Sequence, residues 1–230
     1  SNIMGFYRGP NIVTDGLVFA VDAGSTRSYP GSGTTVTSLV GSATGALNNG
    51  VGFTSSFGGG FTFDGTDDDI SIGTSILNVD AFTVEAIVNI TSTGNTNKTI
   101  FSAGNNSSAG IWFLKHRSGL GNSLVMHGYD GVNPRVNVQS TNVVPDAENA
   151  YVAVTFNGTS YQLYINGVAD GNSVSDNKVG ATSSNFIASN IGTNSYAPGT
   201  IYAVRLYNKA LSATEVAQNY NAQKSRFGLW

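Results

Sequence analysis

The spacing of the carboxylates in this sequence can be compared with the spacing that glycoside hydrolysis requires. Two carboxyl groups on either side of a glycosidic oxygen, one acting as acid and the other as nucleophile or base, can cleave a sugar chain. The chain has three glutamates. Glu85 stands alone in the middle of a predicted strand, Glu148 lies in a predicted turn, and Glu215 fits a helix cap. None of them belongs to a pair with the required spacing, so we expect no cleavage of β-glucans.

Nucleophilic catalysis has no better support. The two histidines, His116 and His127, fall on separate predicted strands, and the sequence contains no G-x-S-x-G turn to present a serine. We therefore interpret both histidines as structural or surface residues. Together with the isolated glutamates, this predicts a protein that is not an enzyme.

A dense acidic stretch reads Asp64-Gly-Thr-Asp67-Asp68-Asp69. Calcium takes about six to eight oxygen ligands from carboxylates and loop carbonyls. Asp64, Asp67 and Asp68 are therefore candidate metal ligands, and Asp22, at the end of the first predicted strand, is another. The alternative is a solvated hairpin without an ion. We expect no required cofactor, and a structural calcium ion is the one candidate.

Two loops combine aromatic side chains with planar polar ones, which is the chemistry that binds sugar rings. The candidate ligand-binding residues are Tyr129, Asp130, Asn133 and Arg135 in one loop and Asn194 and Tyr196 in the other. The alternative is that both tyrosines simply pack over the ends of the fold. The first interpretation predicts a cell-surface glycan as the partner.

The overall composition limits which other partners the protein can bind. Charged residues make up 11% of the chain and the net charge is −3, with lysine and arginine scattered singly, which argues against binding nucleic acid. Cysteine is absent, so disulfides and thiolate metal sites are excluded. No apolar stretch reaches about 18 residues, so we expect no membrane insertion.

The rest of the chain must position these side chains, and its patterns predict an all-β protein. Short alternating segments are separated by turns rich in glycine and asparagine. The predicted strands are Leu17–Asp22, Gly60–Asp64, Asp69–Ile72, Ala81–Ile90, Lys98–Ala103, Gly110–Lys115, Ser123–Gly128, Arg135–Gln139, Tyr151–Phe156, Tyr161–Ile165, Asn185–Ile191 and Thr200–Tyr207. A two-sheet antiparallel β-sandwich is the expected fold.

Three further segments complete this interpretation. Residues 23–60 are expected to form a long loop that could hide short strands around residues 34–39, and a structureless loop of this length is often functional. Asn157–Ser160 is expected to close a hairpin, and Asn166 with Gly167 begins the next turn. Residues 1–15 are expected to form an N-terminal arm, followed by one domain over residues 16–230.

The end of the chain predicts a strand and then a short helix. In the strand, Ile201, Ala203, Arg205 and Tyr207 are expected on one face and Tyr202, Val204 and Leu206 on the other. Ser212 and Glu215 form an S-x-x-E capping box. The predicted apolar stripe of the helix is Ala213, Val216, Ala217 and Tyr220.

Four blocks of sequence resemble the laminin-G-like, concanavalin A-like jelly-roll family, of the kind found in marine bacteriophage structural proteins. They are residues 14–35, the segment Gly60-Phe-Thr-Phe-Asp-Gly-Thr-Asp-Asp-Asp-Ile-Ser-Ile72, the segment Phe82-Thr-Val-Glu-Ala86, and residues 199–220. The resemblance implies a concanavalin A-like β-sandwich with one short C-terminal helix. It also implies an extracellular or virion-surface location.

These expectations lead to three function hypotheses. The first is a non-enzymatic adhesion module on a virion surface that recognises glycans. The second is a purely structural virion or assembly protein, which would bind other copies or other virion subunits through its two apolar termini, the N-terminal arm and Phe227-Gly-Leu-Trp230. A β-glucan-cleaving enzyme is the third and least supported.

Overall fold

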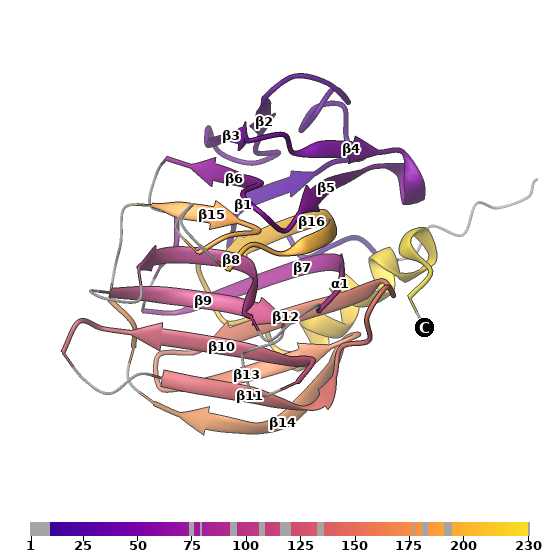
Figure 1. Cartoon of the computed structure of the whole chain (residues 1–230). Coiled ribbons are helices and arrows are strands. Elements are labelled where there is room, and N and C mark those ends of the chain that lie inside the picture. Colours follow the sequence, from indigo (N-terminus) through magenta and orange to yellow (C-terminus); the bar gives the residue numbers. More distant parts are fainter. Residues whose placement is uncertain are drawn as a thin grey trace, which may run out of the picture.

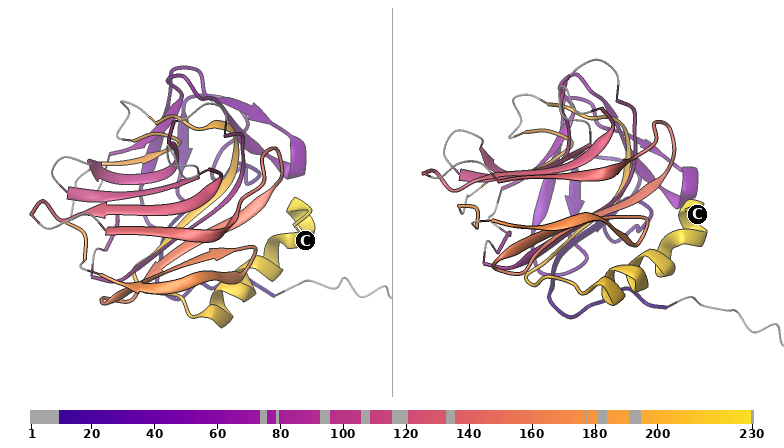
Figure 2. Two further views of the ribbon diagram at one scale, coloured as in Figure 1. Left: turned by 60° about the horizontal axis from the view of Figure 1, so that its bottom comes forward. Right: turned by 90° about the horizontal axis from the view of Figure 1, so that it is seen from below.

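The computed structural model describes residues 10–73, 76–78, 80–92, 96–105, 109–115, 121–132, 136–176, 178–180, 184–190 and 195–229. These residues form two stacked antiparallel sheets with one α-helix lying outside them (Figures 1 and 2). None of the helices in the described ranges has the length and hydrophobicity that crossing a bilayer requires.

The first sheet, sheet A, has the strand order β14-β13-β12-β7-β16-β5-β4, with β1 paired to β16. Its strands are β1 Leu17–Asp22, β4 Gly52–Thr54, β5 Gly60–Asp64, β7 Phe82–Ile90, β12 Ala150–Phe156, β13 Ser160–Ile165, β14 Val168–Ser175 and β16 Pro198–Tyr207. All of its pairings are antiparallel. This is the sheet that the helix covers.

The second sheet, sheet B, has the order β11-β10-β9-β8-β15-β6-β3-β2 and is also antiparallel. Its strands are β2 Thr35–Thr37, β3 Thr44–Asn48, β6 Asp69–Ile72, β8 Lys98–Asn105, β9 Ala109–Lys115, β10 Ser123–Tyr129, β11 Val136–Val143 and β15 Asn185–Ile187. Sheets A and B enclose one large apolar core, so the predicted β-sandwich is confirmed.

Strand β7 shows how the alternating pattern builds this core. Phe82, Val84, Ala86, Val88 and Ile90 all lie in the core between the sheets, as their period of two predicts. The intervening side chains of β7 face outward, towards the helix. The hairpin through residues 157–160 is likewise confirmed, because β12 and β13 pair directly.

The expected loop over residues 23–60 contains regular structure, and β2 confirms the short strand expected around residues 34–39. Strands β3 and β4 and a 3₁₀ turn, Ser56–Gly58, were not expected there. Strand β14 was also missed by the sequence patterns. Both β4 and β14 are sheet edges with little buried apolar surface: Asp170 is the one buried residue of β14. Edge strands of this kind carry no hydrophobic alternation, so pattern analysis does not find them.

Strand β16 departs from strict alternation at a β-bulge. Ile201 lies opposite Val88 while Ala203 lies opposite Ile87, so Tyr202 is an extra residue. The prediction that Ile201 shares a face with Tyr207 is therefore wrong. Ile201 packs in the core between the sheets, whereas Tyr202 joins Tyr207 under the helix.

The helix α1, Ala213–Phe227, begins at the predicted capping box, which is confirmed: Glu215 N donates to Ser212 Oγ and Ser212 N donates to Glu215 Oε2. Its predicted apolar stripe is only partly right. The buried positions are Val216, Asn219, Gln223 and Phe227, while Ala213 is exposed. Two amides take the place of apolar residues because the sheet beneath the helix carries charge.

That charge is the ion pair of Glu85 and Arg205, whose side chains are 0% and 8% exposed. Glu85 Oε1 accepts a hydrogen bond from Arg205 Nη1 at 3.2 Å, and Glu85 Oε2 accepts from Tyr151 Oη at 2.5 Å and Asn219 Nδ2 at 2.8 Å. Arg205 Nη1 also donates to Gln223 Oε1 at 2.7 Å. A buried carboxylate is tolerated when it is paired and hydrogen-bonded in this way.

The N-terminal segment next to this network docks on the same chain. Val13 N donates to Asn219 Oδ1 at 2.7 Å, and Val13 O accepts from Tyr207 Oη at 3.0 Å. Asn11 O accepts from Gln218 Nε2 at 2.7 Å. The described part of the expected arm, residues 10–15, therefore lies against α1, and residues 1–9 fall outside the described residues.

We expect Glu85→Ala to lower the free energy of unfolding by about 3 kcal/mol or more, because it leaves the buried Arg205 guanidinium without its counter-ion. Urea denaturation measures the change. The control is Asp80→Ala, which breaks an exposed ion pair with Lys178 and should cost less than about 1 kcal/mol. Equal losses in the two variants would contradict a stabilising role for the buried pair.

Candidate functional site

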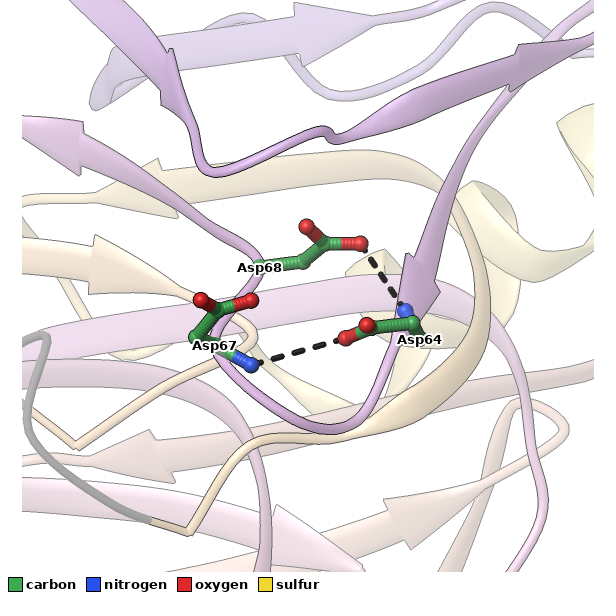
Figure 3. A group of neighbouring side chains, drawn as sticks. All are labelled: Asp64, Asp67 and Asp68. Atoms are coloured by element: carbon green, nitrogen blue, oxygen red, sulfur yellow. Dashed lines mark hydrogen bonds between the residues drawn. The ribbon is translucent and has the colours of Figure 1, made fainter.

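The acidic turn between β5 and β6 brings three of the predicted metal ligands together (Figure 3). One oxygen each from Asp64, Asp67 and Asp68 lies within 4.8 Å of the others. Asp64 Oδ1 accepts hydrogen bonds from the backbone N–H groups of Thr66 and Asp67, and Asp68 Oδ2 accepts from Asp64 N at 3.0 Å. The three carboxylates therefore converge on one side of the turn while two of them also bond its backbone.

The pKa values of Asp64 and Asp68 in this turn shift in opposite directions. Burial, and then the charges of Asp64, Asp67 and Asp69, raise the pKa of the Asp68 carboxyl above its ordinary value. The backbone N–H of Thr66 is the main cause that lowers the pKa of Asp64. Asp69 is fully occupied within the fold, because its oxygens accept from Asn48 and Ser189. A cation would relieve the repulsion at Asp68.

Tyr196 belongs to this same edge of the molecule. Pro198 pairs with Asp64 between β16 and β5, which brings residues 195–198 alongside the acidic turn. The pKa of the Tyr196 hydroxyl is raised by burial and then by the charges of Asp69 and Asp67. Asn194, the other predicted residue of this loop, lies outside the described residues.

The second predicted ligand loop lies elsewhere. Tyr129 is the last residue of β10 and pairs with Gly110 of β9. The pairings that continue from there across β8 and β15 reach β6 at Ile72. The acidic turn is at the opposite end of β6, so Tyr129 and Tyr196 do not form one site. Asp130 Oδ1 accepts from Val132 N at 2.8 Å within a local turn. Asn133 and Arg135 lie outside the described residues.

Asp22, the remaining metal candidate, does not join the acidic turn. Its two carboxylate oxygens accept from Arg226 Nη1 at 2.6 Å and Arg226 Nη2 at 2.9 Å, and Oδ1 also accepts from Gly24 N. This bidentate pair fixes the end of α1 to β1. A Cβ at position 24 would lie 2.6 Å from the backbone oxygen of Gly58 and would also meet the Arg226 guanidinium, which explains the glycine there.

A pocket of about 450 Å³ opens beside the same end of α1. The residues that line this helix-side pocket are Phe57, Asn89, Ala147, Glu148, Asn149, Asn166, Phe227 and Gly228. They come from the 3₁₀ turn, the end of β7, the segment before β12, the β13–β14 turn and the end of α1. Segments far apart in sequence therefore meet there.

Asn149 holds the pocket together. Its Nδ2 donates to Phe227 O at 2.8 Å, and its Oδ1 accepts from Asn89 Nδ2 at 2.9 Å and Tyr202 Oη at 3.2 Å. Asn166 Oδ1 accepts from Tyr151 N at 3.0 Å. Among the described residues, Asn89 Oδ1 receives no hydrogen bond and Asn166 Nδ2 makes none, so both amides keep one group for a ligand.

Phe57 presents the aromatic surface of the pocket. It is 46% exposed, whereas Phe227 is 1% exposed. The Phe57 ring meets Tyr202 edge-on with the centroids 5.8 Å apart. Its backbone has φ +53°, an uncommon value for a bulky residue. Arg226 Nε donates to Phe57 O at 3.0 Å, so the guanidinium that binds Asp22 also fixes this strained turn.

The sequence patterns did not predict this pocket. They indicated a turn at Asn166 and an unpaired glutamate at Glu148, and they placed Phe57 inside the expected loop. The run Phe57-Gly-Gly-Gly60 was the available signal, because an aromatic beside three glycines suits an exposed, tightly turned backbone. The roles of Asn89 and Asn149 depend on tertiary contacts and carry no local signal.

Comparison with known proteins gives the fold a context. A family model described as the concanavalin A-like lectin/glucanases superfamily matches residues 64–217. No curated protein matches the chain in sequence. Domain 4 of a GH43 extracellular arabinanase from Geobacillus stearothermophilus, solved with arabinotriose, has a TM-score of 0.73 at 15% identity, covering 89% of this chain and 98% of that one.

Two larger proteins contain a similar fold. The botulinum neurotoxin serotype D ligand-binding domain, solved with N-acetylneuraminic acid, has a TM-score of 0.68 at 16% identity and covers 91% of this chain. The Trypanosoma rangeli sialidase, solved with sialic acid, has a TM-score of 0.67 at 15% identity and covers 95%. This chain spans 51% of the toxin chain and 35% of the sialidase chain. With its two-sheet fold and a family match over more than half its length, the chain belongs to the concanavalin A-like lectin/glucanase superfamily.

Proposed function

We propose that this protein is a non-catalytic carbohydrate-binding module and that the helix-side pocket holds a sugar residue. The observation that carries the proposal is the half-exposed Phe57 ring beside the free amide groups of Asn89 and Asn166. An aromatic face packs against the C–H surface of a sugar ring, while planar amides bond its hydroxyls.

The positions of the three glutamates favour a protein that binds a sugar without hydrolysing it. Glu85 is 0% exposed and pairs with Arg205, so it has no access to a substrate. Glu215 is used by the helix cap and by Lys209. Glu148 is the one carboxylate among the pocket residues, and hydrolysis of a glycosidic bond by the usual route needs two.

The structural neighbours agree with this function in general terms. The arabinanase domain was solved with arabinotriose and the toxin domain with N-acetylneuraminic acid. These likenesses are at the level of fold, and fold alone does not determine a ligand. The pocket chemistry of this chain therefore carries the argument.

We propose that this module lies outside the cell, on a virion surface. This proposal rests on the sequence resemblance alone. The competing structural role needs a surface that binds other subunits. Asn11 and Val13 hydrogen-bond the chain's own helix, so this part of the arm already has a partner within the chain.

The acidic turn is a second candidate site, where Asp64, Asp67 and Asp68 would hold a calcium ion. The convergence of their oxygens and the raised pKa of Asp68 favour it. A bound calcium would supply positive charge and coordinate oxygen ligands there. The nearby Tyr196 would then offer an aromatic edge to a ligand.

We expect Phe57→Ala to weaken glycan binding by about tenfold or more, because burying a phenylalanine side chain contributes about 1.5–3 kcal/mol. Binding is measured on a glycan array with the protein clustered on beads, since clustering raises avidity. The matched control is Phe53→Ala, a phenylalanine that is 39% exposed and does not line the pocket. Equal loss in both variants would count against the pocket.

We expect saturating calcium to raise the Tm of the wild type by about 5 °C or more, because a ligand that binds only the folded state stabilises it. Asp68→Asn should remove most of this shift while its oxygen still accepts from Asp64 N. Asp80→Asn, at an exposed aspartate outside the turn, should keep the shift. Differential scanning fluorimetry with and without chelator tests this, and no shift in the wild type would rule out the ion.

A further inference from the structure

The charges around the helix-side pocket restrict what it can bind. Among its described lining residues, Glu148 is the only one with a charged side chain. Glu148 is exposed, and within the described part of the chain no hydrogen bond or ion pair occupies its carboxylate. The rest of the lining is aromatic, amide or small. Any ligand in the pocket therefore meets one uncompensated negative charge.

Arg226, whose guanidinium contacts the pocket residue Phe57, already has a counter-ion. It donates through Nε to the backbone oxygen of Phe57, and through Nη1 and Nη2 to both oxygens of Asp22. Its charge is therefore matched by Asp22 in a bidentate ion pair. A sugar carboxylate would have to compete with Asp22 for this guanidinium.

The lining groups that remain suit hydroxyls. Glu148 accepts hydrogen bonds only, and two adjacent sugar hydroxyls can donate to its two oxygens. Asn89 Oδ1 is free to accept another hydroxyl hydrogen, and Asn166 Nδ2 is free to donate to a hydroxyl or ring oxygen. A ligand carboxylate could accept from Asn166 Nδ2 or from the second amide hydrogen of Asn89 or Asn149, but it would be repelled by Glu148.

We infer that the helix-side pocket selects a neutral saccharide residue and rejects acidic sugars such as sialic acid and uronic acids. This inference rests on the proposed function of the pocket and adds its ligand class. Glu148 is the residue that determines the charge preference. The selectivity is opposite to that suggested by fold neighbours solved with N-acetylneuraminic or sialic acid.

The test compares matched pairs of probes that differ in charge. Lactose is paired with 3′-sialyllactose, and galacto-oligosaccharides are paired with galacturono-oligosaccharides; arabinotriose is a further neutral probe. The wild type, Glu148→Gln and Glu148→Lys are measured in chelator, so that no divalent ion can bridge two carboxylates. Asp80→Asn is the control, because it removes an exposed negative charge outside the pocket.

The wild type should bind a neutral probe about tenfold or more tightly than its acidic partner, which corresponds to one contact between like charges. Glu148→Gln should reduce that ratio by about tenfold, Glu148→Lys should reverse it, and Asp80→Asn should keep it. Thermal unfolding of each variant confirms that the exposed substitutions leave the fold intact.

Four outcomes overturn the inference. A wild type that prefers the acidic probes, or a ratio that Glu148→Lys leaves unchanged, overturns the neutral selectivity while carbohydrate binding stands. A blank in chelator that becomes binding when calcium is added places the sugar at the acidic turn instead of the pocket. A blank on every probe, both in chelator and with added calcium, overturns the proposed function and the inference with it.

Discussion

The buried ion pair of Glu85 and Arg205 is the constraint on which the outer side of sheet A depends. A carboxylate and a guanidinium in the middle of a sheet cannot remain in an apolar layer without partners. Tyr151 from β12 and the amides Asn219 and Gln223 from α1 provide those partners. The position of the helix over the sheet is therefore specified by hydrogen bonds as well as by the apolar contacts of Val216 and Phe227.

The pocket is a consequence of where that helix ends. Phe227 closes the last turn of α1, and its carbonyl receives the amide of Asn149. One residue earlier, Arg226 reaches back to β1 and to the turn that carries Phe57. The walls of the pocket thus come from sheet A and α1, and the backbone of Phe57 is fixed by a hydrogen bond from Arg226. Such preorganisation reduces the entropy lost when a ligand binds.

Sequence patterns predicted what depends on regular periodicity. They found β7, the β12–β13 hairpin and the capping box of α1, since each is determined by local alternation or spacing. They failed where tertiary structure overrides the pattern: at the bulge of Tyr202, at the edge strand β14, and at Asn219, whose burial makes sense only opposite Glu85. Of the predicted ligands, the acidic turn came together because its members are neighbours in the chain. The pocket joins five distant segments, and no local signal encodes that.

The docking of α1 also couples sugar binding in the pocket to local unfolding, because the pocket exists only while α1 is docked. A terminal helix held by a limited set of side-chain contacts is a segment that can detach before the sandwich unfolds. Detachment of α1 would separate Phe227 from Asn149 and Arg226 from Phe57, and the pocket would disappear. By mass action a bound sugar would oppose that detachment. Amide hydrogen exchange along the whole of α1 would thus report whether the pocket at its C-terminal end is occupied.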